Sequence, residues 1–270
     1  MKRWLHGAFL TAATVWSLSP FLWQGVTSLK APGQVALLPP LLPDRVSFEN
    51  YAAVFRHEAF LRMMVNSLGI ALGATALALV IGAPGAFGVS RLMGKGKSGV
   101  LMALLVVFML PQVAVVTPFF KMLTAWHLKD TWWALIGVYT VFVVPLVVWV
   151  LVPVFDAVPV SLYHAARVDG SSLWTVFYKI YLPLARPGWI SAGLLGFFFC
   201  WNEFLFALTF TLTDRARTVP VGISLFSGQY EFPWGEISAA GSLVSLPVLL
   251  LVVGAQRYLV RGLVAGSLKG

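Results

Sequence analysis

Two short patterns in the sequence contain residue types that could bind phosphate or zinc. The stretch 94–99 (GKGKSG) has the GxGxxG spacing and also resembles the end of a phosphate-binding P-loop. Such glycines bind phosphate where a strand turns into a helix, whereas this stretch joins two apolar runs and Arg91 replaces the first P-loop glycine. His57-Glu58 begins the zinc-protease pattern HExxH, but Leu61 replaces the second histidine. We therefore predict no nucleotide site, no metal site and no catalytic residue in this chain.

One ionisable pair lies within an apolar run. Asn202 and Glu203 interrupt the stretch FFFCWNEFLF. A charged side chain at the centre of a membrane span costs roughly 2.5–3.5 kcal/mol on insertion scales, so the pair should face protein or water. Either it lines a pathway or bridges helices, or Glu203 reaches the nearby interface or bonds a single neighbouring helix. The sequence leaves both interpretations open.

The composition indicates a membrane protein. Of 270 residues, 59% are hydrophobic and only 11% are charged, whereas soluble domains have about 25% charged residues. The net charge of +9 comes from residues in short connections between apolar runs, as in cytoplasmic loops rather than nucleic-acid-binding faces. Cys200 is the only cysteine, which excludes an intrachain disulfide and a cysteine-based zinc site.

The apolar runs predict an all-α, multi-pass fold. A helix needs about 20 apolar residues to cross a bilayer, and we predict a single transmembrane domain over residues 1–270. Its six spans are 5–29, 63–90, 100–120, 132–155, 188–211 and 237–259. The distribution of lysine and arginine puts both termini and the loop 156–187 on the cytoplasmic side. For 30–62 we expect an extended linker and one surface helix near 48–60, and for 212–236 a polar outer loop.

Gly69 and Gly73 are four residues apart within the second predicted span. This spacing is typical of a face on which another helix packs closely. The partner could be a helix of the same chain or of a second subunit.

The cytoplasmic segment 161–187 is patterned like two short helices. Ser161 is a candidate N-cap, and Gly170 can adopt the left-handed conformation that ends a helix. Ser171 or Ser172 can cap the second helix. That helix has apolar residues at helical spacing: Leu173, Val176, Phe177, Ile180 and Tyr181.

We expect the second helix to stop at Pro183 and Pro187. Two helices joined by a sharp glycine turn form a compact element that suits docking to a partner.

This segment resembles the cytoplasmic EAA loop of ABC-importer permease subunits, whose pattern is Glu-Ala-Ala, three residues, Gly, then Ile-x-Leu-Pro. The corresponding residues are His164-Ala165-Ala166, Gly170 and 180–183 (IYLP). Segments 85–91, 232–236 and 256–270 are similar to carbohydrate-type permeases of the maltose-transporter kind. The resemblance covers nearly the whole chain and implies the type I ABC-importer permease fold.

The resemblance implies three groups of functional residues. Those that couple to an ATPase are Ser161, His164, Ala165, Ala166, Arg167, Asp169, Gly170, Leu182 and Pro183. A C-terminal tail at the ATPase interface would contain Arg261, Gly262, Gly266 and Lys269, unless the tail is disordered. A loop facing a solute-binding protein would contain Phe226, Gly228, Gln229 and Tyr230, unless it is a plain connection.

His164 departs from the family pattern, because it stands where the family usually has glutamate. A neutral imidazole can hydrogen-bond, but it cannot form a carboxylate salt bridge with a partner arginine. This puts that salt bridge in doubt, and Asp169 and Arg167 could carry more of the polar contact.

The implied function is that of a permease subunit of an ATP-binding-cassette importer for a sugar or a related polyol, in the cytoplasmic (inner) membrane. The implied partners are a second, non-identical permease subunit, a cytoplasmic ATPase dimer that binds ATP and Mg²⁺, and an extracytoplasmic solute-binding protein. This chain would be no enzyme and would hold no cofactor. A glycerol-phosphate-type solute is an alternative, and an ion-coupled secondary transporter or a membrane-embedded enzyme are rivals of other classes.

Overall fold

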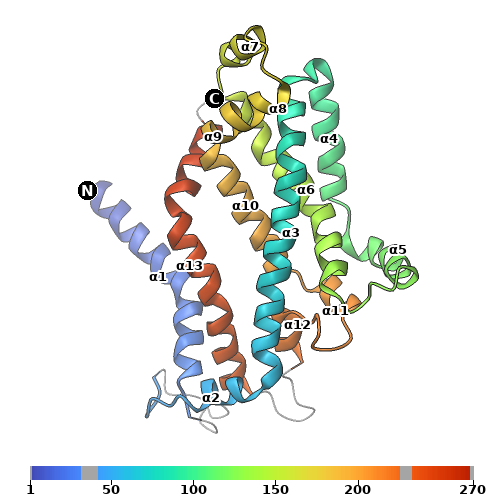
Figure 1. Cartoon of the computed structure of the whole chain (residues 1–270). Helices are drawn as coiled ribbons and strands as arrows, with labels where there is room; N and C mark the ends of the chain where they lie inside the picture. The colour runs from blue at the N-terminus through green and yellow to red at the C-terminus, as the bar shows by residue number, and fades with distance from the viewer. Residues whose placement is uncertain (1, 32–41, 226–232, 268–270) are drawn as a thin grey trace.

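The computed structural model describes residues 2–31, 42–225 and 233–267, and within these ranges all regular structure is helical (Figure 1). This confirms the all-α prediction. The elements are α1 (Lys2–Ser28), α2 (Glu49–Arg56), α3 (Glu58–Arg91), η1 (Gly94–Gly96), α4 (Lys97–Phe108), α5 (Gln112–Ala125), α6 (Trp132–Asp156), α7 (Val160–Val168), α8 (Leu173–Val176), η2 (Phe177–Tyr181), α9 (Leu182–Leu184), α10 (Arg186–Trp201), α11 (Leu205–Phe210), α12 (Val219–Ser224) and α13 (Trp234–Ser267). Below, the α7 end of the bundle is the upper end in Figure 1, and the α2 end is the lower one.

Three described helices are long and apolar enough to cross a membrane. They are residues Ala59–Arg91 of α3, the whole of α6, and Trp234–Gln256 of α13. These match three of the six predicted spans. The pair Gly94–Phe108 and Gln112–Ala125 would add a fourth if the two helices, bent by 81°, count as one span.

The predicted span 100–120 is not one unbroken helix, because the helix breaks between Phe108 and Gln112. Pro111 has no N–H to donate and holds an extended backbone with ψ of 120°. Its ring also disfavours a helical conformation for the residue before it. As a result, α5 leaves the direction of α4 and projects sideways from the bundle (Figure 1).

The predicted span 188–211 is also interrupted, since α10 ends at Trp201 and α11 begins at Leu205. The Glu203 carboxyl group accepts hydrogen bonds from the backbone N–H groups of Phe206 (2.8 Å) and Ala207 (3.1 Å). These are first-turn donors that no carbonyl within α11 can reach. The side chain therefore starts a new helix where the sequence pattern predicted one continuous helix.

Gly69 and Gly73 bring α3 close to α6 within the chain. A Cβ atom on Gly69 would lie 2.2 Å from the Trp132 ring, and one on Gly73 would lie 2.9 Å from Cδ1 of Ile136. The close-packing face predicted from the Gly-xxx-Gly spacing thus receives a helix of the same chain.

The predicted surface helix near 48–60 is shorter than expected and partly buried. It is α2, which ends at Arg56, and its Asn50 and Val54 are buried. The Asn50 side-chain amide donates to the carbonyls of Ser28 (3.0 Å) and Lys30 (2.7 Å). Helix α2 therefore fixes the end of α1 beside the start of α13.

Asp130 joins two connections that are distant in sequence. Its carboxylate accepts hydrogen bonds from the N–H groups of Leu212 (2.9 Å) and Thr213 (3.1 Å) and from the Thr213 hydroxyl. Burial by itself raises the pKa of Asp130, but these hydrogen bonds and the nearby Arg215 outweigh it and lower the pKa. The α5–α6 turn is thereby held against the chain that follows α11.

Gly188 is expected to be intolerant of a side chain. A Cβ atom there would lie 2.6 Å and 2.7 Å from the two methyl carbons of Val154, a β-branched residue that has little room to rotate. Gly188→Ala should therefore lower the unfolding free energy by about 1–3 kcal/mol, the usual cost of overpacking. Gly85→Ala is the matched control, because its Cβ would meet nothing closer than 3.8 Å. Equal thermal stability of the two purified variants would contradict this packing.

Candidate functional site

The segment 161–187 lies at the α7 end of the bundle, where α7 stands outside the bundled helices (Figure 1). The predicted first helix exists as α7, but Ser161 is not its N-cap. Pro159 occupies the N-cap position with a non-helical backbone (ψ 127°), and no side chain caps the helix. Pro159 can hold this position because its φ of −55° is fixed by the ring while its ψ stays outside the helical range. Ser161 is already helical and is exposed.

Gly170 ends α7 in the left-handed conformation, as predicted, with φ of +78°. The Ser171 N–H donates to the Ala166 carbonyl (2.9 Å) and the Gly170 N–H donates to the Arg167 carbonyl (3.2 Å). This pair of hydrogen bonds is the Schellman motif. The Arg167 guanidinium also donates to the Ser171 carbonyl (2.6 Å), which holds the turn from outside.

The second helix is capped by Ser172, one of the two predicted caps, whose hydroxyl accepts from the Thr175 N–H (3.1 Å). The prediction that Pro183 stops this helix is wrong. Helix α8 continues into the π-helical turn η2 and then into α9, and Pro183 lies inside α9. Because the π turn makes Leu182 the start of a new α-helical turn, Pro183 occupies a first-turn position that tolerates proline. The break comes at Ala185.

Buried aromatic rings attach the second helix to the bundle. The Phe177 and Tyr181 rings lie 5.5 Å and 4.9 Å from the ring of Phe87 on α3, centroid to centroid. They lie 6.3 Å and 6.0 Å from the ring of Phe155 on α6. Pairs at these distances are each worth about 0.5–1.5 kcal/mol beyond their burial. A displacement of this helix must therefore also displace the ends of α3 and α6.

Arg91 reinforces this attachment, and sequence reasoning gave it no such role. Its guanidinium donates to the carbonyls of Phe155 and Val158 (2.6 Å for Val158) at the end of α6, and lies 5.0 Å from the Tyr181 ring centroid. A cation is favourable at a helix C-terminus, where carbonyl groups lack internal partners. Burial raises the pKa of Tyr181, although the nearby Arg91 opposes that shift.

Asp156 adds a second polar connection at the same end. Its carboxylate accepts from the Ser90 hydroxyl (2.7 Å) and is ion-paired with Lys97. The 94–99 stretch, which resembles a phosphate-binding loop, is thus held by an acidic side chain of its own chain. In the sequence, Lys97 follows the apolar run that ends near residue 90, and Asp156 ends the apolar run 132–155. This placement was the signal that could have predicted the ion pair.

Most of the residues predicted to couple to an ATPase are exposed at the α7 end of the bundle. His164, Ala165, Arg167, Asp169 and Gly170 are all exposed, whereas Ala166 is buried against its own chain. Among the described residues, none of the exposed ones is in an ion pair. The later pair is less uniform, with Leu182 half-buried and Pro183 exposed.

Large apolar side chains share this surface. Val168 is 87% exposed and Trp174 is 60% exposed, and the Trp174 ring stacks on the exposed Tyr178 ring at 5.9 Å. Apolar groups at the end of a bundle, next to several charged side chains, are typical of a surface that another protein covers. The surface is therefore suited to binding a partner protein.

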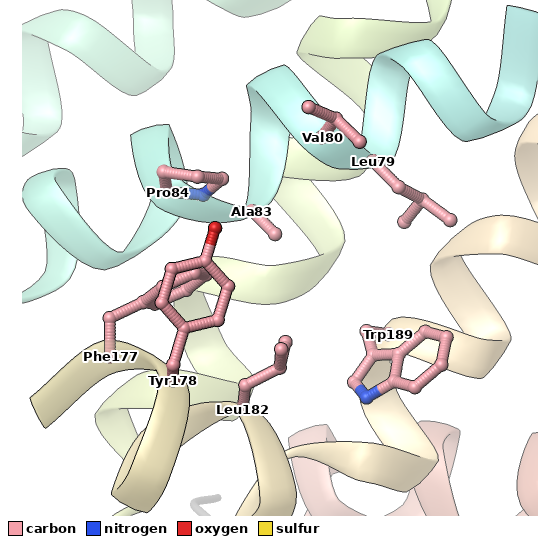
Figure 2. A pocket seen from close by; sticks show the side chains of 8 residues that line it. All are labelled: Leu79, Val80, Ala83, Pro84, Phe177, Tyr178, Leu182 and Trp189. Carbon is pink, nitrogen blue, oxygen red and sulfur yellow. The ribbon is translucent and has the colours of Figure 1, made fainter. Parts of the chain in front are cut away.

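An apolar pocket of about 200 Å³ lies beneath the second helix (Figure 2). Pro84 of α3, Tyr178 of η2 and Trp189 of α10 are among its lining residues. Proline within α3 removes one helical hydrogen bond at this level. The pocket thus lies between the second helix, α3 and α10, beside the ring of Phe177 that packs on Phe87.

The remaining predicted site residues lie elsewhere. Asn202 is exposed and donates to the Phe198 carbonyl (2.8 Å), whereas Glu203 is 6% exposed and also accepts from the Tyr139 hydroxyl of α6 (2.7 Å). Arg261, Gly262 and Gly266 belong to the last turns of α13, which runs on beyond the predicted span end at 259. Lys269 and the predicted loop residues Phe226, Gly228, Gln229 and Tyr230 lie outside the described residues.

Two relatives match the chain over almost its full length. It is 39% identical to the trehalose transport system permease protein SugB of Mycobacterium tuberculosis, over 100% of this chain and 99% of that protein. It is 38% identical to the trehalose/maltose transport system permease protein MalG of Thermococcus litoralis, over 98% and 95% of the two chains.

A solved structure has the same fold. One chain of a bacterial ABC transporter involved in the import of the acidic polysaccharide alginate superposes with a TM-score of 0.79, at 18% identity, over 94% of this chain and 95% of that one. Residues 91–264 match the family model described as binding-protein-dependent transport system inner membrane component. With its exposed two-helix loop, its full-length relatives and this family match, the chain belongs to the family of inner-membrane components of binding-protein-dependent transport systems.

Proposed function

We propose that this chain is the membrane-spanning permease subunit of an ATP-driven sugar importer. The observation that carries the proposal is the loop 161–187, which exposes apolar and charged side chains while buried rings attach it to α3 and α6. Such an element can transmit movement of a docked partner to the membrane helices, because it and the helix ends move together. Family membership and the trehalose transport relatives support a sugar, with a disaccharide such as trehalose as the first substrate to test.

In this proposal the chain holds neither ATP nor Mg²⁺, and a partner ATPase dimer binds both. The ATPase-facing surface consists of Ser161, His164, Ala165, Arg167, Asp169 and Gly170, with Ala166 packed beneath them and Leu182 and Pro183 beyond. The tail residues Arg261, Gly262, Gly266 and Lys269 would lie at the same interface. The family's dependence on a binding protein supports a role for Phe226, Gly228, Gln229 and Tyr230 in contacting one.

A second, non-identical permease subunit would complete the pathway. Only 11% of the apolar stretch of α13 is buried within the chain, against 67% for α6. Lipid and a partner subunit together can cover such a helix, whereas an isolated bundle cannot. We keep six spans, cytoplasmic termini and the inner membrane as parts of this proposal, with α1 as the first span and α10 with α11 as the broken fifth.

Two alternative functions have less support. An ion-coupled secondary transporter would need an ionisable side chain free to bind the ion within the membrane. The candidate, Glu203, is already bonded to Tyr139, Phe206 and Ala207. A glycerol-phosphate-type solute stays the alternative within the same family.

Cross-linking from the exposed loop tests the proposal. In membranes containing the whole transporter, Ala165→Cys should form a thiol-specific cross-link to the ATPase subunit, because Ala165 is exposed and the native Cys200 is buried. Leu212→Cys is the matched control, being 65% exposed at the other end of the molecule. The proposal fails if Ala165→Cys gives no ATPase product, or if Leu212→Cys gives as much of it.

A further inference from the structure

A second site of unusual composition lies at the α2 end of the bundle, where α1 meets the start of α13. It is a pocket of about 580 Å³ whose polar lining comes from Gln24, Thr27, Lys30 and Ser238, and whose aromatic lining comes from Trp23 and Trp234. It is far from the two-helix loop, and no role described above uses it. Its lining comes mainly from two helices that are distant in sequence.

Lys30 is the unusual residue of this pocket, because only 2% of it is exposed. Within the described ranges, no carboxylate lies within 4 Å of its ammonium group, and its recorded side-chain contact is the Trp23 ring at 4.8 Å. Glu236 is at the start of α13 but lies 3.8 Å from His57 instead. A ring face compensates a desolvated cation by only about 0.5–2 kcal/mol, whereas burying a charge without a counter-ion costs more.

Thr27 supplies a second unsatisfied group. Its hydroxyl oxygen is buried and has no hydrogen-bond partner among the residues that the structure describes. A buried hydroxyl without a partner costs about 1–3 kcal/mol, so native structures seldom leave one unless a bound species completes it. Within the described ranges, an ammonium group without a carboxylate and a hydroxyl without a hydrogen-bond partner call for a ligand rich in acceptor oxygens.

The backbone holds these side chains in place before any ligand arrives. Asn50 of α2 donates to the carbonyls of Ser28 and Lys30, and the Ser28 hydroxyl is 2.8 Å from the Tyr51 hydroxyl. These contacts involve the backbone of Lys30 and leave its side chain available. The Gln24 side chain crosses α13 at Gly241, where a Cβ atom would lie 2.3 Å from its amide nitrogen.

From these contacts we propose that the pocket binds the phosphate group of a phosphate ester, with Lys30 as counter-ion and Thr27 and Gln24 as hydrogen-bond donors. Phosphate has the negative charge and the acceptor oxygens that this set lacks. The pocket is also large enough for a glycerol unit beside the phosphate. Trp23 and Trp234, at the ends of two apolar helices, are typical of the membrane interface, where phospholipid headgroups supply this chemistry. A soluble ester of the same chemistry is the other source.

The test is lipid retention by the purified full-length chain, measured by native mass spectrometry in detergent. Phosphatidylglycerol should bind the wild type about tenfold more tightly than the Lys30→Met variant, the usual scale for one charge-assisted hydrogen bond. Lys129→Met is the matched control, because that ammonium also lies over a ring, 4.6 Å from the Phe120 centroid, but lines no part of this pocket. Diacylglycerol with the same acyl chains should show no preference for the wild type.

Competition identifies the source of the phosphate. Glycerol phosphate displacing the lipid from the wild type would support a site open to soluble esters, and failure to displace it would support a headgroup site. Equal retention of phosphatidylglycerol by the wild type and Lys30→Met would overturn the proposal. The proposal would also be overturned if the wild type retained diacylglycerol as well as it retains phosphatidylglycerol. If Lys30→Met does not fold, Thr27→Val takes its place, and unchanged lipid affinity of that near-isosteric variant would overturn the proposal too.

Discussion

Gly170→Leu is expected to abolish sugar uptake while the protein still inserts into the membrane at normal levels. Gly170 has φ of +78°, and a left-handed residue with a side chain costs roughly 1–2 kcal/mol. A Cβ atom there would meet nothing within 4 Å, so the damage comes from the backbone and stays at the turn. The Schellman hydrogen bonds would be lost and α7 would leave its orientation. Uptake by proteoliposomes containing the whole transporter, and stimulation of its ATPase activity, measure the effect.

Gly170→Asn is the matched control, because asparagine tolerates the left-handed region better than other residues with a side chain. It should keep most of the uptake that Gly170→Leu loses. Wild-type uptake itself should need ATP and persist with an uncoupler, whereas an ion-coupled carrier would show the opposite pattern. If Gly170→Leu transports like the wild type, the loop geometry does not matter for coupling.

Glu203→Ala should destabilise the protein more than any other single substitution considered. The Glu203 carboxyl group is 6% exposed and accepts hydrogen bonds from Tyr139, Phe206 and Ala207. Removing it leaves three buried donors without their acceptor, and each buried donor left unsatisfied costs about 1–3 kcal/mol. We expect the start of α11 to fray and the melting temperature of the purified protein to fall by more than that of any surface variant.

Two milder substitutions separate capping from helix bridging. Tyr139→Phe removes only the bond from α6 and should cost about 1 kcal/mol, in line with one ordinary hydrogen bond. Glu203→Gln keeps one acceptor oxygen and should fall between the two. If Glu203→Gln retains full stability but loses transport, the side chain acts on the pathway and its structural role is secondary.

Local chemistry made several features predictable. Gly170 in a left-handed turn and Ser172 as an N-cap follow from hydrogen bonds that span five residues or fewer. The membrane-spanning stretches of α3, α6 and α13 could be predicted from composition alone, because a run of about 20 apolar residues is long enough to cross a bilayer as a helix. The predictions that failed concern helix ends, where neighbouring residues compete to start or stop the helix. Pro159 precedes Ser161 as the N-cap, and Pro183 lies inside the helix that it was predicted to stop. The Glu203 carboxyl group caps a new helix inside the predicted span 188–211.

The contacts that attach the loop 161–187 to α3 and α6 could not be predicted from the sequence. Phe87, Phe155 and Tyr181 come from three elements far apart in the chain, and aromatic residues are common in any apolar span. The same holds for Lys30, whose burial depends on the packing of α1 against α13 and α2 and is not visible in the sequence.

The sequence by itself determined that this chain is a helical membrane protein with a two-helix loop and a glycine turn at its centre. These properties depend on composition and on neighbours along the chain, which are written directly in the order of residues. Only the tertiary structure decided which rings hold the loop, where Arg91 binds, that Glu203 starts a helix, and that Lys30 lies in a pocket with no carboxylate of the described residues beside it. Each of these depends on side chains brought together by the packing of distant helices, a many-body outcome that no local pattern encodes.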